Sequence, residues 1–385
     1  MSKNGFKKIF KRLFIRLIQQ QEGDKVLLAT VAVLIVIGLI MLSSASSVIS
    51  YQMEGNSYYF LKNQLFALGI GILAFWFFSK FNYQYLKKYA LVALFASIIL
   101  LLAVFIPSLA AESERADSWI EIFGRSVQPS EFVKLTFLIY LSAWFAGKQG
   151  EKKEKGAEKK MTPFVIVYAI IAVLMMFQPD FGTLFIITIA SFVVYLAAGG
   201  RIKHILVLGL IGVLIFAILV SLNKYQQARF KCVANTNFSP ESEQLECYQV
   251  RQSLIAVGSG GLFGRGLGAS RQKFLYLPDA HNDFIFSIIG EELGFVLCVI
   301  LIILFLVLFY RGYLIARRVD DNFGKYLSIG IVSWLAVQVV LNIGGSINLL
   351  PMTGVPLPFI SAGGSSLLAT MIAIGILANI SKQGK

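Results

Sequence analysis

Ten apolar segments recur along the 385-residue chain, and they limit the possible folds more than any other feature. An α-helix needs about twenty consecutive apolar residues to cross the hydrocarbon of a bilayer, and each segment is close to that length. Only 15% of the residues are charged, whereas soluble domains carry about a quarter. The sequence therefore predicts an all-α, polytopic integral membrane protein with ten transmembrane helices. They are expected near residues 26–43, 60–78, 87–107, 131–147, 163–178, 183–198, 203–222, 284–310, 325–345 and 363–381.

The basic residues follow the pattern of membrane topology. With the N-terminus in the cytoplasm, about two thirds of the 35 Lys and Arg residues fall in inner segments, as the positive-inside rule expects. The prediction is therefore N-in and C-in, and the net charge of +14 is not attributed to a nucleic-acid-binding face. This topology divides the chain into a basic cytoplasmic tail (1–24), a membrane domain (25–381) and a short cytoplasmic tail (382–385). A large extracytoplasmic loop, 223–283, joins the seventh and eighth helices.

Pro, Gly and isolated charges gather in the outer connections, which places function on the outer face. The most unusual stretch is 277–294, where a polar loop runs directly into an apolar segment. Asp283 lies at that junction, and two compatible roles follow. It would cap the helix, where the positive end of the helix dipole favours a carboxylate, or act as a partly shielded base. His281, one of two histidines in the chain, lies two residues before it.

Two adjacent carboxylates, Glu291 and Glu292, follow Asp283 by about 12–14 Å along a helix. A carboxylate at that depth in a bilayer must be paired, protonated or in contact with water. The pair therefore indicates either a polar channel or a structural network that anchors the helix, and the network is favoured. His281 would share a helix face with Glu292 if the helix began early enough, because their separation is close to three turns.

Three further charged groups have more than one interpretation. Glu131 and Lys134 are one helical turn apart and are expected to form an internal ion pair with a supporting role. The alternative is that either of them contacts Asp283, Arg115 or a substrate phosphate. Asp180 is expected to form a turn or to cap the sixth helix, and a direct catalytic role is less favoured.

A glycine-rich stretch at 258–268 resembles a nucleotide-binding loop only superficially. No strand is expected before it, and neither Gly-Lys-Ser nor Gly-Lys-Thr follows it. It is expected to form a re-entrant segment with tight turns. Its main-chain amides, together with Arg265, Arg271 and Lys273, could bind a pyrophosphate.

Two other patterns in the large loop concern a metal and a disulfide. Asp279, His281 and Asp283 alternate in a way that would suit a divalent cation, Mg or Mn, but the pattern is not specific, so the metal stays open. Cys232 and Cys247 lie on the oxidising side of the membrane. A disulfide between them is expected to stabilise the loop by roughly 3 kcal/mol.

Five stretches together resemble the SEDS family (shape, elongation, division and sporulation) of bacterial cell-wall polymerases. They occur in family order over nearly the whole chain, at 128–134, 178–183, 248–268, 277–294 and 342–366. The resemblance implies ten membrane helices and a peptidoglycan glycosyltransferase. This enzyme would polymerise lipid II, an undecaprenyl-pyrophosphate-linked disaccharide peptide, at the outer face of the bacterial cytoplasmic membrane. The resemblance also assigns the catalytic carboxylate to Asp283.

The resemblance also implies partners and helps to define candidate contacts. A class B penicillin-binding protein, other divisome proteins and membrane lipid are the expected partners, and nucleic acid is not. Two positions depart from the family pattern. Ser118 stands where an Arg usually precedes Trp119, and Ala362 stands where a Tyr usually precedes two glycines. The candidate substrate contacts are Arg115, Trp119, Lys134, Arg265, Arg271, Lys273, His281 and Ser365, and the candidate supporting residues are Glu131, Asp180, Glu291 and Glu292.

The expected chemistry needs a single base. Outside the cell there is no ATP or nucleotide sugar, so the donor must arrive activated by a lipid pyrophosphate, whose developing charge needs stabilisation but no proton. Asp283 would remove the proton from the acceptor GlcNAc 4-OH, with inversion to a β-1,4 link. Within the SEDS family, residues 280–294 resemble the division-type, septal polymerases more than the elongation-type ones. The alternatives are an elongation-type polymerase, a lipid II transporter and a non-catalytic scaffold.

Overall fold

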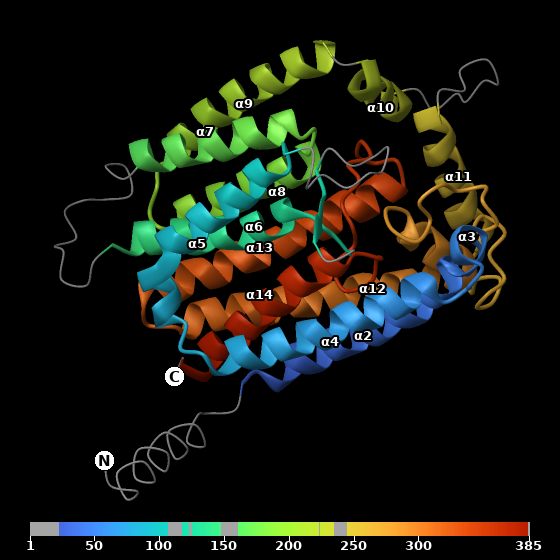
Figure 1. The fold of residues 1–385 in the computed structure, drawn as a ribbon, viewed down its shortest axis with the longest axis horizontal. Coiled ribbons are helices and arrows are strands. Elements are labelled where there is room, and N and C mark those ends of the chain that lie inside the picture. The colour runs from blue at the N-terminus through green and yellow to red at the C-terminus, as the bar shows by residue number, and fades with distance from the viewer. Residues whose placement is uncertain are drawn as a thin grey trace, which may run out of the picture.

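The structure is a computed structural model that describes residues 23–106, 118–122, 125–147, 161–222, 224–234 and 245–383. Its described part is mainly helical (Figure 1). The first helices are α2 (Lys25–Ala45), α3 (Ser47–Glu54), α4 (Tyr59–Lys80), α5 (Gln84–Ala103), α6 (Pro129–Ala146), α7 (Met161–Phe177) and α8 (Phe181–Ala197). The remaining helices are α9 (Ile202–Leu222), α10 (Lys224–Ala234), α11 (Leu245–Ser259), α12 (Ile285–Arg318), α13 (Asn322–Ser346) and α14 (Gly364–Gln383).

Each of the ten expected apolar segments coincides with a helix. Among the described residues, six helices are long and apolar enough to cross a membrane, namely α2, α4, α5, α12, α13 and α14. Shorter apolar stretches lie in α7, α8 and α9. The protein is therefore a helical, multi-pass membrane protein. The expected all-α class needs one amendment, because β1 (Ile120–Ile122) and β2 (Arg125–Val127) form a small antiparallel pair.

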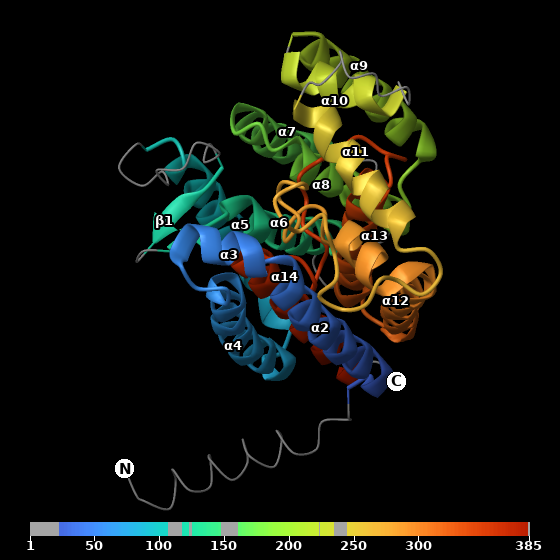
Figure 2. The same ribbon diagram turned by 90° about the vertical axis from the view of Figure 1, so that its right-hand side faces the viewer.

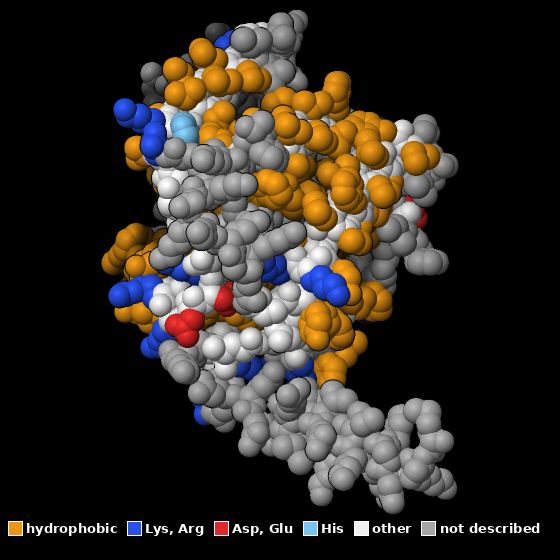
Figure 3. All heavy atoms as spheres, turned by 90° about the vertical axis from the view of Figure 1, so that its left-hand side faces the viewer, with side chains coloured by type: hydrophobic (Ala, Val, Ile, Leu, Met, Phe, Trp, Pro, Cys, Tyr) orange, Lys and Arg blue, Asp and Glu red, His pale blue; other side chains and the backbone are white. Residues whose placement is uncertain are grey.

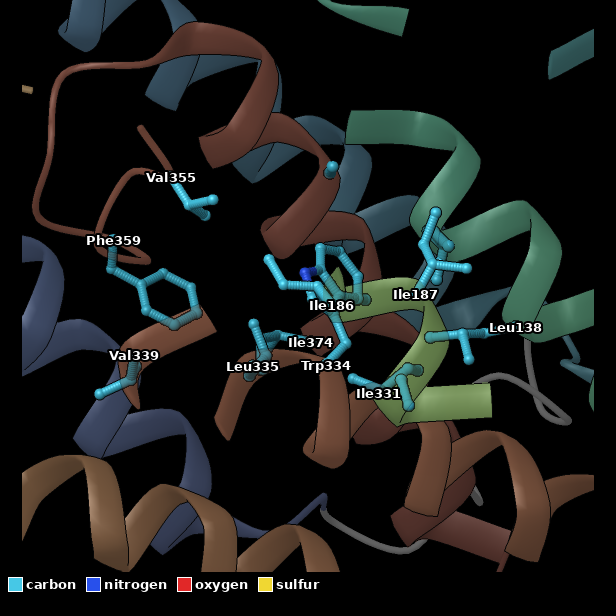
Figure 4. Packing of buried hydrophobic residues seen from close by; sticks show 14 of the residues in the cluster. Leu138, Ile186, Ile187, Ile331, Trp334, Leu335, Val339, Val355, Phe359 and Ile374 are labelled. Atoms are coloured by element: carbon cyan, nitrogen blue, oxygen red, sulfur yellow. The ribbon is translucent and has the colours of Figure 1, made fainter. Parts of the chain in front are cut away.

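The interior of the bundle is formed by α13 and α6, which pack against each other and against both α8 and α14. Trp334 of α13 is fully buried at its centre, facing Leu138 of α6 and Ile186 of α8 (Figure 4). Val355 and Phe359, from the connection between α13 and α14, cover the same core. The helices α4, α5 and α9, at the periphery of the bundle, instead expose apolar side chains such as Leu73, which suits a lipid-facing surface.

The helices run roughly side by side, and the longer loops gather at one end of the bundle. Figure 1 shows this end on the right, with α3, α10, α11 and the loop that follows α11. Figure 2 looks onto the same end and shows that loop lying between α2, α11 and α12. The segment expected as one large loop thus contains two helices, α10 and α11. We call the end of the bundle where these loops gather the outer end.

The glycine-rich segment is built into a break in α12. Gly294 has φ +77° and ψ −179°, so the helix is interrupted there. Residues 261–266 take up the hydrogen bonds that the break leaves open. Four main-chain bonds of 2.9–3.1 Å join Arg265 to Glu291, Gly266 to Glu292, Phe295 to Gly261 and Val296 to Leu262. Non-helical backbone at membrane depth must be satisfied within the protein, and this segment satisfies it.

Substituting Gly264 is expected to destabilise the protein more than substituting Gly261. Both have positive φ, so an alanine at either position strains the backbone by about 1–2 kcal/mol. A Cβ on Gly264 would also lie 2.2 Å from the Glu292 carbonyl oxygen, whereas nothing lies within 4 Å of one on Gly261. We expect a total cost of about 4 kcal/mol for Gly264→Ala, measured by thermal unfolding in detergent. Equal midpoints for the two variants would contradict this close packing.

Candidate active site

Asp283 lies at the outer end, just before α12, but it does not cap that helix. The helix begins at Ile285, and its N-cap position is Phe284, with no side-chain capping bond. The cap prediction is therefore wrong. The reason is a preceding turn, in which the N–H groups of Asp283 and Phe284 donate to the carbonyl of Asp279 at 3.1 and 3.4 Å. The delayed start also leaves His281 outside the helix, so the expected shared face with Glu292 does not form.

The backbone at Asp283 is held from α13. Asn342 Nδ2 donates to the Asp283 carbonyl at 3.0 Å and to the Val355 carbonyl at 2.8 Å. Next to Val355, Gly354 has φ +71°, and a Cβ on it would lie 3.7 Å from Asp283 Oδ2. The carboxylate thus lies against this loop. Asp283 as a whole is only partly buried, although its Oδ1 is enclosed by the protein.

A buried charge network lies below this loop. Lys134 Nζ is 2.7 Å from Glu131 Oε1 and 3.0 Å from Gln338 Oε1. Gln338 Nε2 donates to the Pro356 carbonyl at 2.8 Å, and Trp334 Nε1 donates to Gln338 Oε1 at 2.7 Å. Glu131 and Lys134 are both buried and pair with each other. Of the two expected alternatives, the structure therefore has the internal ion pair. Lys134 therefore supports the loop beside Asp283 and does not itself reach the surface.

Asp180 joins the outer ends of three helices. It caps α8 by accepting from the Thr183 N–H at 3.1 Å, and its other oxygen accepts from Ser130 Oγ at 2.6 Å. Gln128 Nε2 also donates to Asp180 at 3.3 Å, and the Gln128 N–H donates to Ser365 Oγ at 3.1 Å. The starts of α6, α8 and α14 are thereby connected. Ser365 takes part in this connection through its hydroxyl.

The first outer loop is described only in part. Ser118 Oγ donates to the Gln178 carbonyl at 2.6 Å, so this departure from the family pattern anchors the loop to the end of α7. Trp119, beside it, is partly buried. Arg115, a candidate substrate contact, lies outside the described residues.

Glu291 and Glu292 form a buried network and not a channel. Glu292 accepts from Ser44 Oγ at 2.7 Å and from Lys273 Nζ at 3.0 Å. Glu291 accepts from Ser270 Oγ at 2.5 Å and from the Arg271 N–H at 3.0 Å. Both carboxylates are almost fully buried. They fasten the loop that follows α11 to α12 and to α2.

The three basic residues of this loop do not share one role. Lys273, a candidate substrate contact, is buried and paired with Glu292, so it faces inward. Arg271 is exposed, and Arg265 is about one-third exposed, with its guanidinium 3.7 Å from Glu291 Oε1. Two of the three cations are therefore available to an anionic ligand at the outer end.

His281 and its neighbours do not form a metal site by themselves. The His281 ring packs against Phe60 of α4 with a centroid separation of 4.3 Å, and its carbonyl accepts from the Ala362 N–H at 3.0 Å. In the described part of the chain, no group of three or more His, Cys, Asp or Glu side chains could hold a metal ion. Asp279 lies within the turn that precedes α12, with φ +53°.

Cys232 of α10 and Cys247 of α11 are joined by a disulfide, with their Cα atoms 5.3 Å apart. Denaturing alkylation is therefore expected to label one thiol, that of Cys298, before reduction and three after it. The Cys232→Ser/Cys247→Ser variant should lose roughly 3 kcal/mol of stability, because the unfolded chain gains conformational entropy. Three labelled thiols before reduction would contradict this pairing.

Three residues at or near the site were not among the candidates, namely Asn342, Gln338 and Ser44. A signal for the first two exists, because an Asn and a Gln four residues apart on one face of an apolar helix need partners inside the protein. Ser44 carries no comparable signal. Its role follows only from the packing of α2 against α12.

Comparison with known proteins gives concordant matches. The model of a family described as "cell cycle protein", covering FtsW, RodA and SpoVE, matches residues 24–385. Stage V sporulation protein E of Bacillus subtilis (strain 168) is 38% identical over 367 residues, which cover 95% of this chain and 99% of that protein. The probable peptidoglycan glycosyltransferase FtsW of Trichlorobacter lovleyi is 37% identical over 94% of this chain and 93% of its own length. A chain solved in work on polymerization and crosslinking by a peptidoglycan synthase complex superposes with a TM-score of 0.73 and 25% identity, covering 93% of this chain and 97% of that one.

Proposed function

Because this chain belongs to the FtsW, RodA and SpoVE family of cell cycle proteins, we infer that it is a peptidoglycan glycosyltransferase of the bacterial cytoplasmic membrane. The substrate proposed is lipid II, which the enzyme polymerises into β-1,4-linked glycan. The FtsW relatives support a role in septal synthesis during division. An elongation role, of the RodA type, is the alternative within the family.

The proposed topology has ten crossings with both termini in the cytoplasm. Figure 3 views the end of the bundle opposite to the site and shows Lys and Arg side chains around it, with few acidic ones. This end carries the connection between α4 and α5, the start of α9 and the connection between α12 and α13. Positive charge at one end supports a cytoplasmic location for it. The outer end, with residues 223–283, then faces away from the cytoplasm.

The proposed mechanism assigns the base to Asp283. Its carboxylate removes the proton from the acceptor GlcNAc 4-OH as that oxygen attacks the anomeric carbon of the lipid-linked donor sugar. The bond from that carbon to the pyrophosphate breaks, and the electron pair leaves with the pyrophosphate. Because the oxygen attacks from the side opposite to the leaving group in a single displacement, the configuration at that carbon is inverted. Arg271 and Arg265 would stabilise the negative charge that develops on the leaving group.

One observation carries this assignment. Of the four carboxylates in the 277–294 segment, Glu291 and Glu292 are buried, whereas Asp279 and Asp283 are partly exposed, and Asp283 is the one that lies against the loop at Gly354. Glu291 and Glu292 are buried and already accept hydrogen bonds from the protein. A divalent cation, Mg or Mn, would help to neutralise the pyrophosphate. The described side chains do not form a site for it, so no step is assigned to it.

The proposed partner is a class B penicillin-binding protein transpeptidase. Likeness to a chain of a peptidoglycan synthase complex supports this partner. Other divisome proteins and the surrounding lipid would contact the exposed apolar helices.

A lipid II transporter is the alternative from another class, but the break in α12 does not support it. Broken helices in transporters direct their free ends at a substrate cavity. Here residues 261–266 fill the break with main-chain hydrogen bonds. The free ends are therefore satisfied by the protein's own loop.

Purified protein with fluorescent lipid II tests the proposed function. We expect glycan chains, with a higher yield when the cognate penicillin-binding protein is present. Liposomes that carry lipid II in the inner leaflet provide the comparison. Movement of lipid II between leaflets without polymerisation would support the transporter instead.

A further inference from the structure

We propose that a groove between α2, α4 and residues 267–273 binds the hydrocarbon chain of the lipid-linked sugar substrate. The groove has a volume of about 600 Å³, which lies within the usual range for ligand pockets. Its apolar walls come from Leu39 and Ile40 of α2, Leu61 and Leu65 of α4, and Leu267 of the loop, and its polar end is lined by Lys273, Gly268 and three serines, Ser43, Ser44 and Ser47. This inference rests on the proposed function, because it names where that substrate is held.

The groove opens toward the bilayer. Ile40, Leu65 and Leu267 are each about half exposed, although all three are strongly apolar. They lie on helices long and apolar enough to cross a membrane, or on the loop beside them. Exposed apolar side chains of this kind face lipid, so a chain can enter the groove sideways from the membrane.

The polar end of the groove does not provide a site for an anionic head group. Lys273 Nζ lies there, with three acceptors around it, namely Glu292 Oε1 at 3.0 Å, Ser44 Oγ at 3.0 Å and the Gly268 carbonyl at 2.6 Å. An ammonium has three N–H donors, so all of them are used. Glu292 also balances its charge. The groove therefore suits an uncharged hydrocarbon chain.

The groove is adjacent to the proposed catalytic segment. Leu61 follows Phe60, whose ring packs against His281 with a centroid separation of 4.3 Å, and His281 precedes Asp283 by two residues. Residues 267–273, which form one wall, belong to the same loop as Asp283 and carry the exposed Arg271. A chain held here would leave its pyrophosphate at the outer end, near Arg271 and Asp283.

This adjacency favours the substrate chain over a bulk phospholipid. A lipid that only seals the space between two helices needs contact with those helices alone. Here the third wall is the loop that leads to Asp283, so occupancy of the groove and the position of the reacting sugar are linked. The groove thus binds one membrane-anchored substrate molecule and positions its sugar at the site.

The first test fills the groove. Leu65→Trp is compared with Leu73→Trp, which lies on α4 away from the groove and is also exposed. We expect Leu65→Trp to raise KM for lipid II with a full-length prenyl chain by about tenfold, equivalent to roughly two buried methylene groups, with kcat unchanged. KM for an analogue with a ten-carbon chain should not change, and Leu73→Trp should change neither value. An equal rise for both chain lengths would overturn the proposal.

The second test needs no enzymatic activity and uses the wild-type chain. A prenyl pyrophosphate with a benzophenone at its far end is irradiated with the protein in nanodiscs, and labelled peptides are identified. We expect labels in the 39–47 and 61–65 segments that a long-chain prenyl phosphate removes and excess phospholipid does not. Equal competition by phospholipid, or labels elsewhere, would overturn the proposal. Labelling of these segments in a protein that polymerises nothing would retain the groove and reject the proposed function.

If Leu65→Trp elutes as aggregate on size exclusion, Ile40→Phe fills the same groove from α2 with a smaller change. The same dependence of KM on chain length is expected. Its absence in a folded Ile40→Phe, together with unchanged photolabelling, would count against the groove.

Discussion

Asp283→Asn is expected to lower the rate of lipid II polymerisation by about 10²–10⁴-fold, the contribution usual for a general base. The amide has nearly the shape of the carboxylate but cannot accept the proton of the acceptor hydroxyl. The backbone contacts that hold this position, from Asn342 and the Asp279 turn, involve main-chain atoms and should persist. The rate is measured from the glycan products of fluorescent lipid II.

Asp279→Asn is the matched control for this substitution. Asp279 lies in the same turn with φ +53°, a conformation that asparagine tolerates well. We expect it to retain activity within a few-fold of the wild type, and both variants to unfold at the wild-type temperature. Polymerisation by Asp283→Asn at the wild-type rate would reject the base. Equal losses in both variants would instead indicate that the two carboxylates act together.

Lys273→Met is expected to destabilise the protein by about 3–5 kcal/mol, the cost usual for removing one partner of a buried ion pair. Glu292 would remain buried, with Ser44 and the Ser270 N–H as its remaining donors. Methionine keeps the volume and apolar stem of the lysine, so lost packing contributes little. Denaturant or thermal unfolding of the purified protein in detergent measures the change.

The double variant Lys273→Met/Glu292→Gln separates charge from packing. Replacing the carboxylate by a neutral amide removes the unpaired charge, so part of the stability should return. We expect an interaction free energy of about 1–3 kcal/mol in the double-mutant cycle. Strictly additive losses would show that the two side chains stabilise the protein independently, and the ion pair would then have no energetic role.

Sequence reasoning could anticipate the environment of these charges but not their partners. The cost of a bare carboxylate in hydrocarbon requires that Glu291 and Glu292 be satisfied, and this holds for any fold. Their donors are Ser44 on α2 and residues 270–273 of the loop, which are far apart in the chain. No local spacing rule connects them, so Lys273 was expected at the substrate.

The start of α12 is a second feature that sequence reasoning could not anticipate. Capping rules favour Asp283 as the N-cap residue of α12, since it is an acidic residue directly before a long apolar run. The turn that bonds Asp283 and Phe284 back to Asp279 competes with the helix for the same N–H groups. Because the turn forms, the helix begins later, and the Asp283 main chain is held by Asn342 instead of by its own helix.

The sequence alone determined that this chain crosses a membrane many times and that its ten apolar segments form helices. The reason is physical, since about twenty apolar residues can be buried in a bilayer only as a hydrogen-bonded helix. It also singled out the outer segment around Asp283. Only the tertiary structure decided that Lys273 pairs with Glu292 and Ser270 donates to Glu291, that residues 261–266 repair the break at Gly294, and that Asn342 holds Asp283. These contacts join elements distant in sequence, and only their packing brings the partners together.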